Sequence, residues 1–485
     1  MKPGYHVIIV GSGVAGIAAA DTLAGHGLDI LIIDENPYAG GQMIRETCRL
    51  SHGFWKFNPG LLRSKGFTLA RKITRNLKQI DLPKGVDCIH QAQVLGVFPD
   101  QGLLGHRLLV HTQASLSPKG TDHGQVLEVK AEYLVFATGA RERYLPFKGW
   151  TLPGVMSLGG AQILMKSSGI LPARNTLIAG TSPLQMALAA DILKNKGSVT
   201  AILDENRLAR KIRLLPLLGN QWPRAGEGAV QMLGLILGQV RFRQGVRVAE
   251  ARGKEGLETV VTAELDRTGK ILPGTEKIYP AKALAIGYGF CANIELPVQA
   301  GCDIEYHKDR GGWVVRADEN LETSVRSVYA AGEITGIAGA GKSFIEGKLA
   351  ALSILEKLRI TNKSPESAQD LILRRTQQMG YAKFLNRLCE VPPSAFEAIP
   401  DETLICRCEE ISMGELKKRI RQGFRTAGSL KKATRCGMGR CQGRICRPVM
   451  FDILLALTGR SPEQTGKSLS RAPVKNVSIK AFLQK

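Results

Sequence analysis

The stretch of sequence that decides the fold is residues 5–36, YHVIIVGSGVAGIAAADTLAGHGLDILIIDEN. It starts with a short apolar run at 6–10, of the kind that fills a buried parallel strand. The Ala-rich segment 17–26 favours a helix, and 28–33 is a second apolar run. This order of strand, glycine turn, helix and strand predicts the beginning of a nucleotide-binding α/β domain.

The turn and the end of the second strand carry the residues that such a site needs. Gly11 permits the tight turn, Gly13 lets the backbone approach a diphosphate, and Gly16 lets the helix pack close to the strand. The first turn of the helix offers free N–H groups to the phosphates. Asp34 and Glu35 follow the second strand, where an acid accepts hydrogen bonds from a ribose. Together these features predict a dinucleotide site, in preference to a turn that merely packs a helix on a sheet, without distinguishing NAD from FAD.

Length, composition and charge set broad limits. A chain of 485 residues is expected to form about two to four domains, and 44% hydrophobic residues supply ample core. No segment reaches the roughly 20 apolar residues of a membrane-spanning helix, and the N-terminus shows no leader pattern, which favours the cytoplasm. The net charge of +23 would suit nucleic acid, an anionic membrane or an acidic protein, but we favour a solvated surface because the basic residues are spread over the chain. No nucleic-acid-binding signature is present, so no nucleic-acid partner is predicted.

Three further motifs accompany the opening turn. Gly40-Gly41-Gln42 forms a glycine-rich loop soon after the second strand. An apolar run at 133–137 ends in Thr138-Gly139, and another, within 323–331, ends in Gly332-Glu333. Cys48 has no second cysteine close after it, so the Cys-x-x-x-x-Cys pair of disulfide reductases is absent at this place. Disulfide reductase activity is therefore not expected.

Residues 175–204 repeat the opening layout of strand, turn, helix and strand with altered glycines. The turn keeps Gly180, but Ser182 and Gln185 stand where the second and third glycines belong. A side chain at the second position crowds a diphosphate, and one at the third pushes the helix off the strand. The fold should persist, but the pattern argues against NAD(P) binding in the usual mode. The segment can equally be the structural remnant of a nucleotide domain.

These five pieces, in this order, resemble the FAD-dependent pyridine nucleotide-disulfide oxidoreductase fold over about residues 1–355. The resemblance implies that Val94 contacts the adenine through its backbone and that the acid of the last motif binds the ribityl chain. It assigns the opening turn to FAD. The implied FAD-binding residues are Gly11, Gly13, Gly16, Asp34, Glu35, Gly41, Gln42, Val94, Thr138, Gly139, Gly332 and Glu333.

The C-terminal part of the chain is rich in cysteine. Five of the ten cysteines fall between residues 406 and 446. In a cytosolic chain such a cluster favours a metal over disulfides. Between them, Ser412 is a plausible cap for a basic helix at 414–422. Thiolates suit zinc or an iron–sulfur cluster, but the single residue between the first two cysteines is tighter than zinc pairs usually are.

Cys-x-Cys followed by a gap of thirty-two residues and a third cysteine resembles the bacterioferritin-associated-ferredoxin-like (BFD-like) domain, which carries a [2Fe-2S] cluster. The family's final pair is often Cys-x-x-Cys, whereas four residues separate the last two cysteines here, so Cys436 is the alternative ligand. The implied ligands are Cys406, Cys408, Cys441 and Cys446. Three basic neighbours would stabilise an anionic cluster, namely Arg407, Arg440 and Arg444.

The run GMGRCQGRIC at 437–446, joined to this flavoprotein body, resembles the larger subunit of heteromeric amino-acid and opine dehydrogenases over nearly the whole chain. The implied fold is α/β, with a Rossmann-like FAD domain, an inserted NAD(P)-like domain and a small α-helical [2Fe-2S] domain. The expected divisions are 1–150 and 291–355 for the two halves of the FAD domain, 151–290 for the NAD(P)-like domain, 356–398 for a linker, 399–455 for the [2Fe-2S] domain and 456–485 for a tail.

The resemblance also implies a division of labour between chains. A D-amino-acid-oxidase-like flavoprotein partner would oxidise the C–N bond of an amino acid, imino acid or opine, and this chain would move the electrons to a quinone or another acceptor. Peripheral attachment to the inner face of the cell membrane is compatible with such a complex, and so is a small additional subunit. No catalytic base is predicted in this chain, because its histidines are scattered; those considered are His6, His26, His52 and His90.

Two other functions stay open on the residues alone. One is a self-sufficient NAD(P)H-dependent FAD and iron–sulfur oxidoreductase, against which Ser182 and Gln185 argue. The other is a non-catalytic flavin protein whose thiolates hold zinc and which serves in assembly of a complex.

Overall fold

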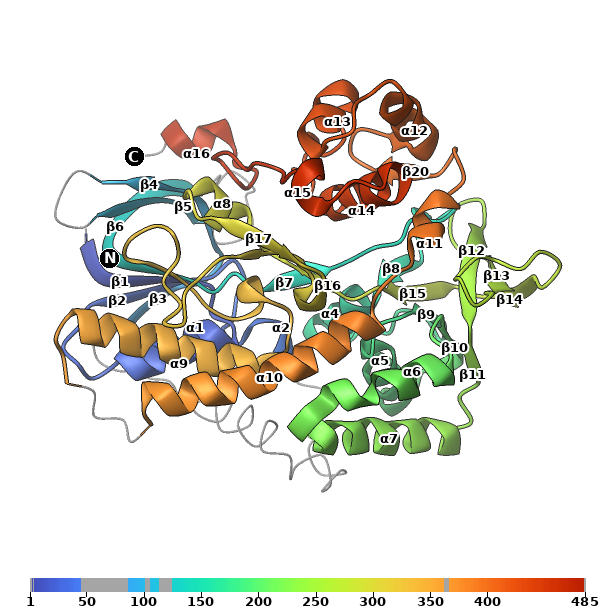
Figure 1. Ribbon diagram of the computed structural model, residues 1–485, viewed down its shortest axis with the longest axis horizontal. Helices are drawn as coiled ribbons and strands as arrows, with labels where there is room; N and C mark the ends of the chain where they lie inside the picture. The colour runs from blue at the N-terminus through green and yellow to red at the C-terminus, as the bar shows by residue number, and fades with distance from the viewer. Residues whose placement is uncertain are drawn as a thin grey trace.

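The structure is a computed structural model, and it describes residues 2, 4–44, 86–100, 105–112, 124–361 and 366–483. Figure 1 shows two α/β units side by side, with a small helical module beside both of them. Cys48 and His52, which the sequence singled out, lie outside the described residues.

A seven-stranded sheet forms the first α/β unit, in the order β3-β2-β1-β6-β5-β4 with β19 beside β6. All four residues of β2 are buried, because a parallel strand inside such a sheet is covered on both faces. β19 pairs with β6 although it lies far along the chain, so this unit is built from two separate segments. The strands are β1 (Gly4–Val10), β2 (Ile30–Ile33), β3 (Val86–Ile89), β4 (Ala92–Pro99), β5 (His106–Thr112), β6 (Gln125–Phe136) and β19 (Val328–Ala330).

Two helices of the first unit pack closely against each other. α1 (Val14–Leu23) follows the opening turn, and α9 (Ala340–Lys357) follows the Gly332-Glu333 motif. A Cβ at Gly347 would lie 2.1 Å from the carbonyl oxygen of Ala15, so only glycine permits this approach. The opening strand, helix and strand were predicted from the sequence, and the structure confirms them.

A five-stranded parallel sheet forms the second α/β unit, in the order β11-β10-β9-β15-β8. The predicted repeat of strand, helix and strand is confirmed here. The elements are β8 (Val155–Ser157), α4 (Leu158–Ser168), β9 (Asn175–Gly180), α5 (Leu184–Lys194), β10 (Ser198–Asp204), α6 (Leu208–Leu214), α7 (Trp222–Leu237), β11 (Phe242–Gln244) and β15 (Ala283–Gly287). An antiparallel sheet follows β11, with β12 (Val246–Arg252), β13 (Thr259–Glu264) and β14 (Lys277–Pro280).

The chain crosses between the two units twice, and the crossings pair with each other. β7 (Ala140–Glu142) leaves the first unit, and β16 (Phe290–Ala292) returns antiparallel to it. α8 (Glu295–Gln299) follows β16 directly. A hairpin of β17 (Ile304–His307) and β18 (Gly312–Val315) lies next along the chain.

The segment predicted as a partly helical linker contains the longest helix of the described chain, α10 (Ala368–Leu388). Figure 1 shows α10 running along both α/β units. It contacts α9 of the first unit, and α6 and the 3-10 turn Leu215–Gln221 of the second. α10 is therefore a brace between the units rather than only a connection to the C-terminal module.

The C-terminal module shares an apolar core with the second unit. Trp150 donates a hydrogen bond of 2.7 Å to the carbonyl oxygen of Leu404, and Phe147 belongs to the same buried cluster as Val449. The side chain of Ser412 accepts a hydrogen bond from the backbone of Glu415, so the predicted cap is confirmed. The elements are α11 (Pro393–Glu397), β20 (Leu404–Cys406), β21 (Ile411–Ser412), α12 (Met413–Arg421), α13 (Ala427–Thr434), α14 (Cys446–Thr458), α15 (Pro462–Thr465) and α16 (Ile479–Leu483).

Candidate flavin and iron–sulfur sites

A cavity of about 530 Å³ lies at the carboxyl end of the first sheet. Every residue that the sequence predicted for FAD lines this cavity except Gly16. The structure therefore brings together segments that are distant in the chain, from the opening turn to the Gly332-Glu333 motif. A cleft at the carboxyl ends of parallel strands is where dinucleotides bind in this class of sheet.

The three glycines of the opening turn have different structural roles. A Cβ at Gly11 would lie 2.3 Å from the carbonyl oxygen of Ala137, and one at Gly16 would lie 1.9 Å from that of Gly11. These two glycines are required by the protein's own packing. A Cβ at Gly13 would meet nothing within 4 Å, so the chain itself leaves the space over this residue open. Open space over Gly13 beside the N-terminus of α1 fits a diphosphate.

The two acids after β2 differ in exposure: one is buried and holds the turn, and the other is accessible. Asp34 is buried and accepts hydrogen bonds from the backbone of Ser12 at 2.6 Å and from the backbone of Asn36 at 2.7 Å. It thereby fixes the shape of the glycine turn. Glu35 is exposed and pairs with Lys475 of the C-terminal tail. Of the two predicted acids, Glu35 is the one with the freedom to meet a ribose.

Glu333 holds the start of α9 against the cavity. One of its carboxylate oxygens accepts hydrogen bonds from the backbone of Gly339 at 2.7 Å and from the hydroxyl of Ser343 at 3.3 Å. Burial raises the pKa of Glu333, while the charge of Lys342 and these hydrogen bonds oppose the rise. Glutamate at this position therefore reaches both the helix start and the cavity.

Behind this motif lies a buried ion cluster that sequence reasoning missed. The ammonium of Lys342 and the carboxylate of Glu346 are 2.9 Å apart, and both side chains are 0% exposed. Glu346 also accepts hydrogen bonds from the backbone of Gly332 at 2.8 Å and from Arg375 of α10 at 2.7 Å. The cluster thus fixes the Gly332-Glu333 turn from behind. A lysine and a glutamate four residues apart within an apolar stretch of helix were its only signal in the sequence.

The crossover motif is held by a second set of unpredicted residues. The hydroxyl of Thr138 donates to the carbonyl oxygen of Asn293 at 2.7 Å. Arg141, which is half-buried, and the buried Glu295 form a bidentate pair with distances of 2.7 and 3.0 Å. Burial opposes charge on Glu295, but the nearby Arg141 guanidinium lowers its pKa overall. Arg141 therefore supplies a permanent positive charge to the wall of the cavity.

The second glycine turn has the same backbone form as the first but faces a different neighbour. A Cβ at Gly180 would lie 2.1 Å from the carbonyl oxygen of Gly287, which repeats the close approach seen at Gly11. Thr181 donates to the carbonyl oxygen of Cys389 at 3.2 Å, and Asn206 donates to that of Leu388 at 3.0 Å. By position in the repeat, Thr181 and Asn206 correspond to Ser12 and Asn36 of the first turn. The donors of the second turn are therefore used by the C-terminal end of α10.

The predicted obstacles at the second turn are also buried. Ser182 is 3% exposed and Gln185 is 2% exposed. The C-terminus of a helix carries partial negative charge, which repels a diphosphate. The structure thus gives a second reason, besides Ser182 and Gln185, why NAD(P) should not bind here in the usual mode.

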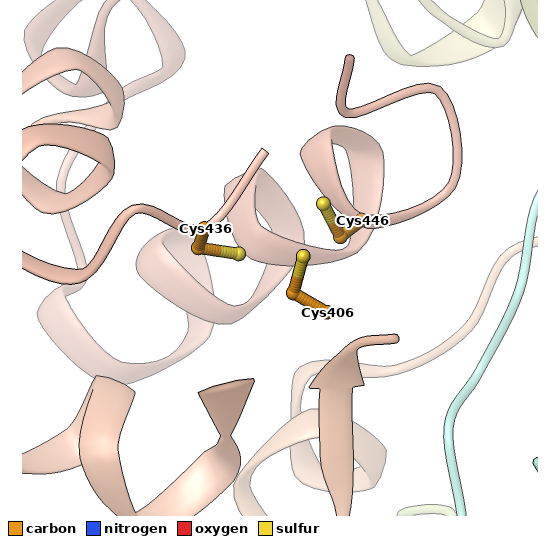
Figure 2. Close-up of side chains that lie close together, drawn as sticks. All are labelled: Cys406, Cys436 and Cys446. Carbon is orange, nitrogen blue, oxygen red and sulfur yellow. The ribbon is translucent and has the colours of Figure 1, made fainter. Parts of the chain in front are cut away.

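Three cysteines of the C-terminal module come into direct contact (Figure 2). The sulfur atoms of Cys406, Cys436 and Cys446 all lie within 4.8 Å of one another, and all three residues are buried. Cys406 ends β20, and Cys446 begins α14. Hydrogen bonds from Cys436 and Cys446 lower the pKa of Cys406 to about 2. The same hydrogen bonds raise the pKa of Cys436 and raise that of Cys446 to about 12, so the three thiols share one thiolate. Three buried soft sulfurs that share a charge fit a metal or an iron–sulfur cluster.

The other two cysteines form a second pair beside this group. Cys408 is exposed and shares a hydrogen bond with the thiol of Cys441. Cys441 lies close enough to Cys446 for its charge to affect the pKa of that thiol. The structure thus groups the predicted Cys406 and Cys446 with the alternative, Cys436, and places the predicted Cys408 and Cys441 as a pair beside them. Which four bind the cluster stays a prediction.

The cavity and the cysteine group meet through the C-terminal module. Arg444, two residues before Cys446, lines the cavity and donates to the backbone oxygen of Cys441 at 3.2 Å. A half-buried ion pair of 3.8 Å joins Arg143, next to β7, to Asp452 of α14. The two sites are therefore neighbours, and basic side chains lie between them.

Comparison with known proteins agrees with this architecture. Residues 5–368 match the family model described as pyridine nucleotide-disulphide oxidoreductase, and residues 404–455 match the BFD-like [2Fe-2S] binding domain. Among solved structures, an L-proline dehydrogenase from P. horikoshii aligns with a TM-score of 0.68 and 20% identity over 99% of this chain and 79% of that one. That likeness concerns the fold.

Two relatives are similar over almost their whole length. The opine oxidase A subunit of Agrobacterium tumefaciens is 30% identical over 98% of this chain and 90% of its own. The hydrogen cyanide synthase HcnB subunit of Pseudomonas aeruginosa is 31% identical over 98% of this chain and 97% of its own. The chain therefore belongs to the pyridine nucleotide-disulphide oxidoreductase family and is an FAD-dependent oxidoreductase with a BFD-like [2Fe-2S] domain.

Proposed function

We propose that this chain is the electron-transfer subunit of a heteromeric dehydrogenase or oxidase. A D-amino-acid-oxidase-like flavoprotein partner oxidises the C–N bond of an amino acid, imino acid or opine, and this chain passes the electrons to a quinone or another acceptor. The relatives named above are themselves subunits of opine oxidase and hydrogen cyanide synthase, which supports a complex of unlike chains.

The observation that carries this proposal is the contrast between the two glycine turns. The first faces an open cavity, whereas the donors of the second, Thr181 and Asn206, bind the end of α10. A flavin in the first site then has no neighbouring pyridine nucleotide to reduce it. Its electrons have to come from outside the chain, and a partner flavoprotein supplies them.

The residues of this chain hold and tune the cofactors rather than transform a substrate. When bound, FAD exchanges electrons in pairs and the [2Fe-2S] cluster one at a time, which links a two-electron donor to single-electron acceptors. Arg141 and Arg444 place positive charge on the cavity wall. The Arg143–Asp452 pair and the apolar core that includes Trp150 fix α14 against the α/β body, so the distance between the sites is constant.

None of the histidines in the described part of the chain lines the FAD cavity. His6 accepts a hydrogen bond from the backbone of Asp29 at 3.0 Å, and His106 is buried within β5. Neither lines the cavity.

We place the complex in the cytoplasm, attached peripherally to the inner face of the membrane when the acceptor is a quinone, and with room for a small additional subunit. Among the described residues, no helix is long and apolar enough to cross a bilayer.

The deciding experiment mixes the FAD-loaded chain anaerobically with NADH, with NADPH, or with a set of amino acids and opines in the presence of the partner flavoprotein. The expected result is bleaching of the flavin absorbance only when partner and substrate are both present. The [2Fe-2S] absorbance should decrease after the flavin absorbance. Rapid bleaching by NADH or NADPH at low concentration would instead show a self-sufficient reductase and would overturn the proposal.

A further inference from the structure

The C-terminal tail returns to the first α/β unit and closes one end of the FAD cavity. Figure 1 shows the tail leaving the helical module and reaching α16 beside the first sheet. Val474 is 2% exposed, belongs to the core of the first unit, and donates a backbone hydrogen bond of 2.8 Å to Leu95 of β4. A Cβ at Gly96 would lie 2.8 Å from the Cβ of Ala472, so the tail packs directly on the strand that carries Val94. Both Val474 and Lys475 line the cavity.

The loop that bears the cluster cysteines grips this tail. The guanidinium of Arg444 donates to the carbonyl oxygen of Val474 and, at 3.2 Å, to that of Cys441. The amide of Gln442 donates to the carbonyl oxygen of Pro473 at 2.9 Å. Two side chains from the cysteine loop therefore hold two successive residues of the tail. The tail in turn places Lys475 against Glu35, the acid after β2.

The charged residues that line the cavity indicate what the contact between the tail and the cysteine loop does. The acids that line the cavity are Asp34, Glu35, Glu295 and Glu333, and they disfavour the dianionic diphosphate of FAD. Three cations line it, Arg141, Arg444 and Lys475, and the last two come from outside the α/β units. Most of the positive charge at the site thus depends on the C-terminal module and its tail.

We propose that Arg444 and residues 472–475 form a latch over the nucleoside end of the FAD cavity, so that retention of FAD is coupled to an intact cysteine loop. This inference rests on the proposed role of the cavity as the FAD site. Coupling between two binding events is reciprocal, because each ligand stabilises the closed latch by the same factor. Bound FAD therefore protects the cluster, and the bound cluster holds FAD.

The test measures FAD affinity of the full chain, from the fluorescence of released flavin, in Arg444→Ala and Lys475→Ala variants and in a chain ending at Ser470. Arg444→Ala should raise the FAD dissociation constant about tenfold. ADP, which lacks the flavin ring, should lose affinity by a similar factor because the latch covers the nucleoside end. Matched controls are Lys432→Ala in α13 of the same module and Lys467→Ala in the same tail, and each should stay within about twofold of the wild type because both residues are exposed and neither lines the cavity.

Removal of the cluster with a chelator gives the second readout. It should release FAD from the wild-type chain, and saturating FAD should slow cluster loss by a similar factor. Circular dichroism and the cluster absorbance report whether each variant is folded. If the shortened chain does not fold, the two point variants alone test the latch. Unchanged FAD affinity in both point variants, or after cluster removal, would overturn the latch alone. A wild-type chain that binds no FAD would overturn the proposed function as well.

Discussion

The buried Lys342–Glu346 pair makes a sharp prediction, because the chain carries a matched pair beside it that is only half-buried. Glu346 on α9 contacts a lysine of the same helix and Arg375 of α10, and its side chain is 0% exposed. Glu366 likewise contacts a lysine of α9 and an arginine of α10, but its side chain is 31% exposed. Glu346→Gln and Glu366→Gln therefore remove the same charge from the same kind of site at two depths.

The expected magnitudes differ by several kcal/mol. Breaking a buried pair costs about 3–5 kcal/mol, because Lys342 is left as a buried cation with only the negative charge of Glu333 near it. Breaking a pair that water reaches costs about 0–1 kcal/mol. With a urea m-value of about 3 kcal/mol/M, Glu346→Gln should lower the unfolding midpoint by roughly 1–1.7 M and Glu366→Gln by at most about 0.3 M. The assay is urea unfolding of the FAD-loaded chain, followed by flavin release.

The pH dependence supplies an independent check. Burial lowers the pKa of Lys342 below its ordinary 10.5, although the charge of Glu346 opposes this. In Glu346→Gln that opposition is lost, so the folded state sheds the lysine proton more easily than the unfolded state does. The unfolded state then binds more protons, and stability rises with pH. The loss of stability in Glu346→Gln should therefore become smaller as pH rises from neutrality towards 10.5. Equal shifts of the urea midpoint in the two variants, or a loss of stability that does not depend on pH, would refute this reasoning.

Three other experiments test separate parts of the structure. Gly13→Asp should give folded, flavin-free protein that keeps its cluster, whereas Gly16→Asp should fail to fold. The reason is that only Gly13 has open space for a side chain. Flavin content, iron content and circular dichroism distinguish these results. Serine replacement at Cys406, Cys408, Cys441 or Cys446 should abolish the [2Fe-2S] absorbance, and Cys436→Ser should keep two irons per chain; an iron-free Cys436→Ser chain would place that residue among the ligands. In the wild type, burial opposes charge on Glu346, but Lys342 lowers the pKa of Glu346 overall. The stability that the pair contributes should therefore be present above pH 4.5 and be lost as pH falls further. The measurement is the urea unfolding midpoint between pH 6 and 3.

The parts of the fold that local sequence predicts well are those whose signal is contained in one short segment. The opening strand, turn, helix and strand follow from apolar runs and glycines within residues 5–36, and the structure reproduces them and their altered copy near Gly180. The Ser412 cap was predictable for the same reason, because its partner Glu415 lies three residues away.

The features that sequence reasoning missed depend on contacts between distant segments. The partner of Thr181 at the end of α10 lies 208 residues away, and the partner of Glu35 in the tail lies 440 residues away. Nothing in the tail distinguishes Lys475 from the other basic residues of a chain with 66 of them. Among the cysteines, spacing alone could not show that Cys436 packs against Cys406, because the turn after α13 brings it there.

The two glycine turns show that the same backbone pattern can either face an open cavity or be covered by the protein's own helix. Gly11 and Gly180 make the same close approach to a neighbouring strand, so both turns are built correctly. What differs is the dipole that each one meets. At the first turn the N–H groups of α1 face an open cavity, which attracts phosphate. At the second, the C-terminal end of α10 is held against the turn by hydrogen bonds from Thr181 and Asn206, so a diphosphate there would meet negative potential. Because α10 also braces the two units, restoring the second site would loosen the body that positions FAD against the cysteine module. On the proposed function, loss of the pyridine-nucleotide site and dependence on an external electron donor are therefore consequences of the same helix.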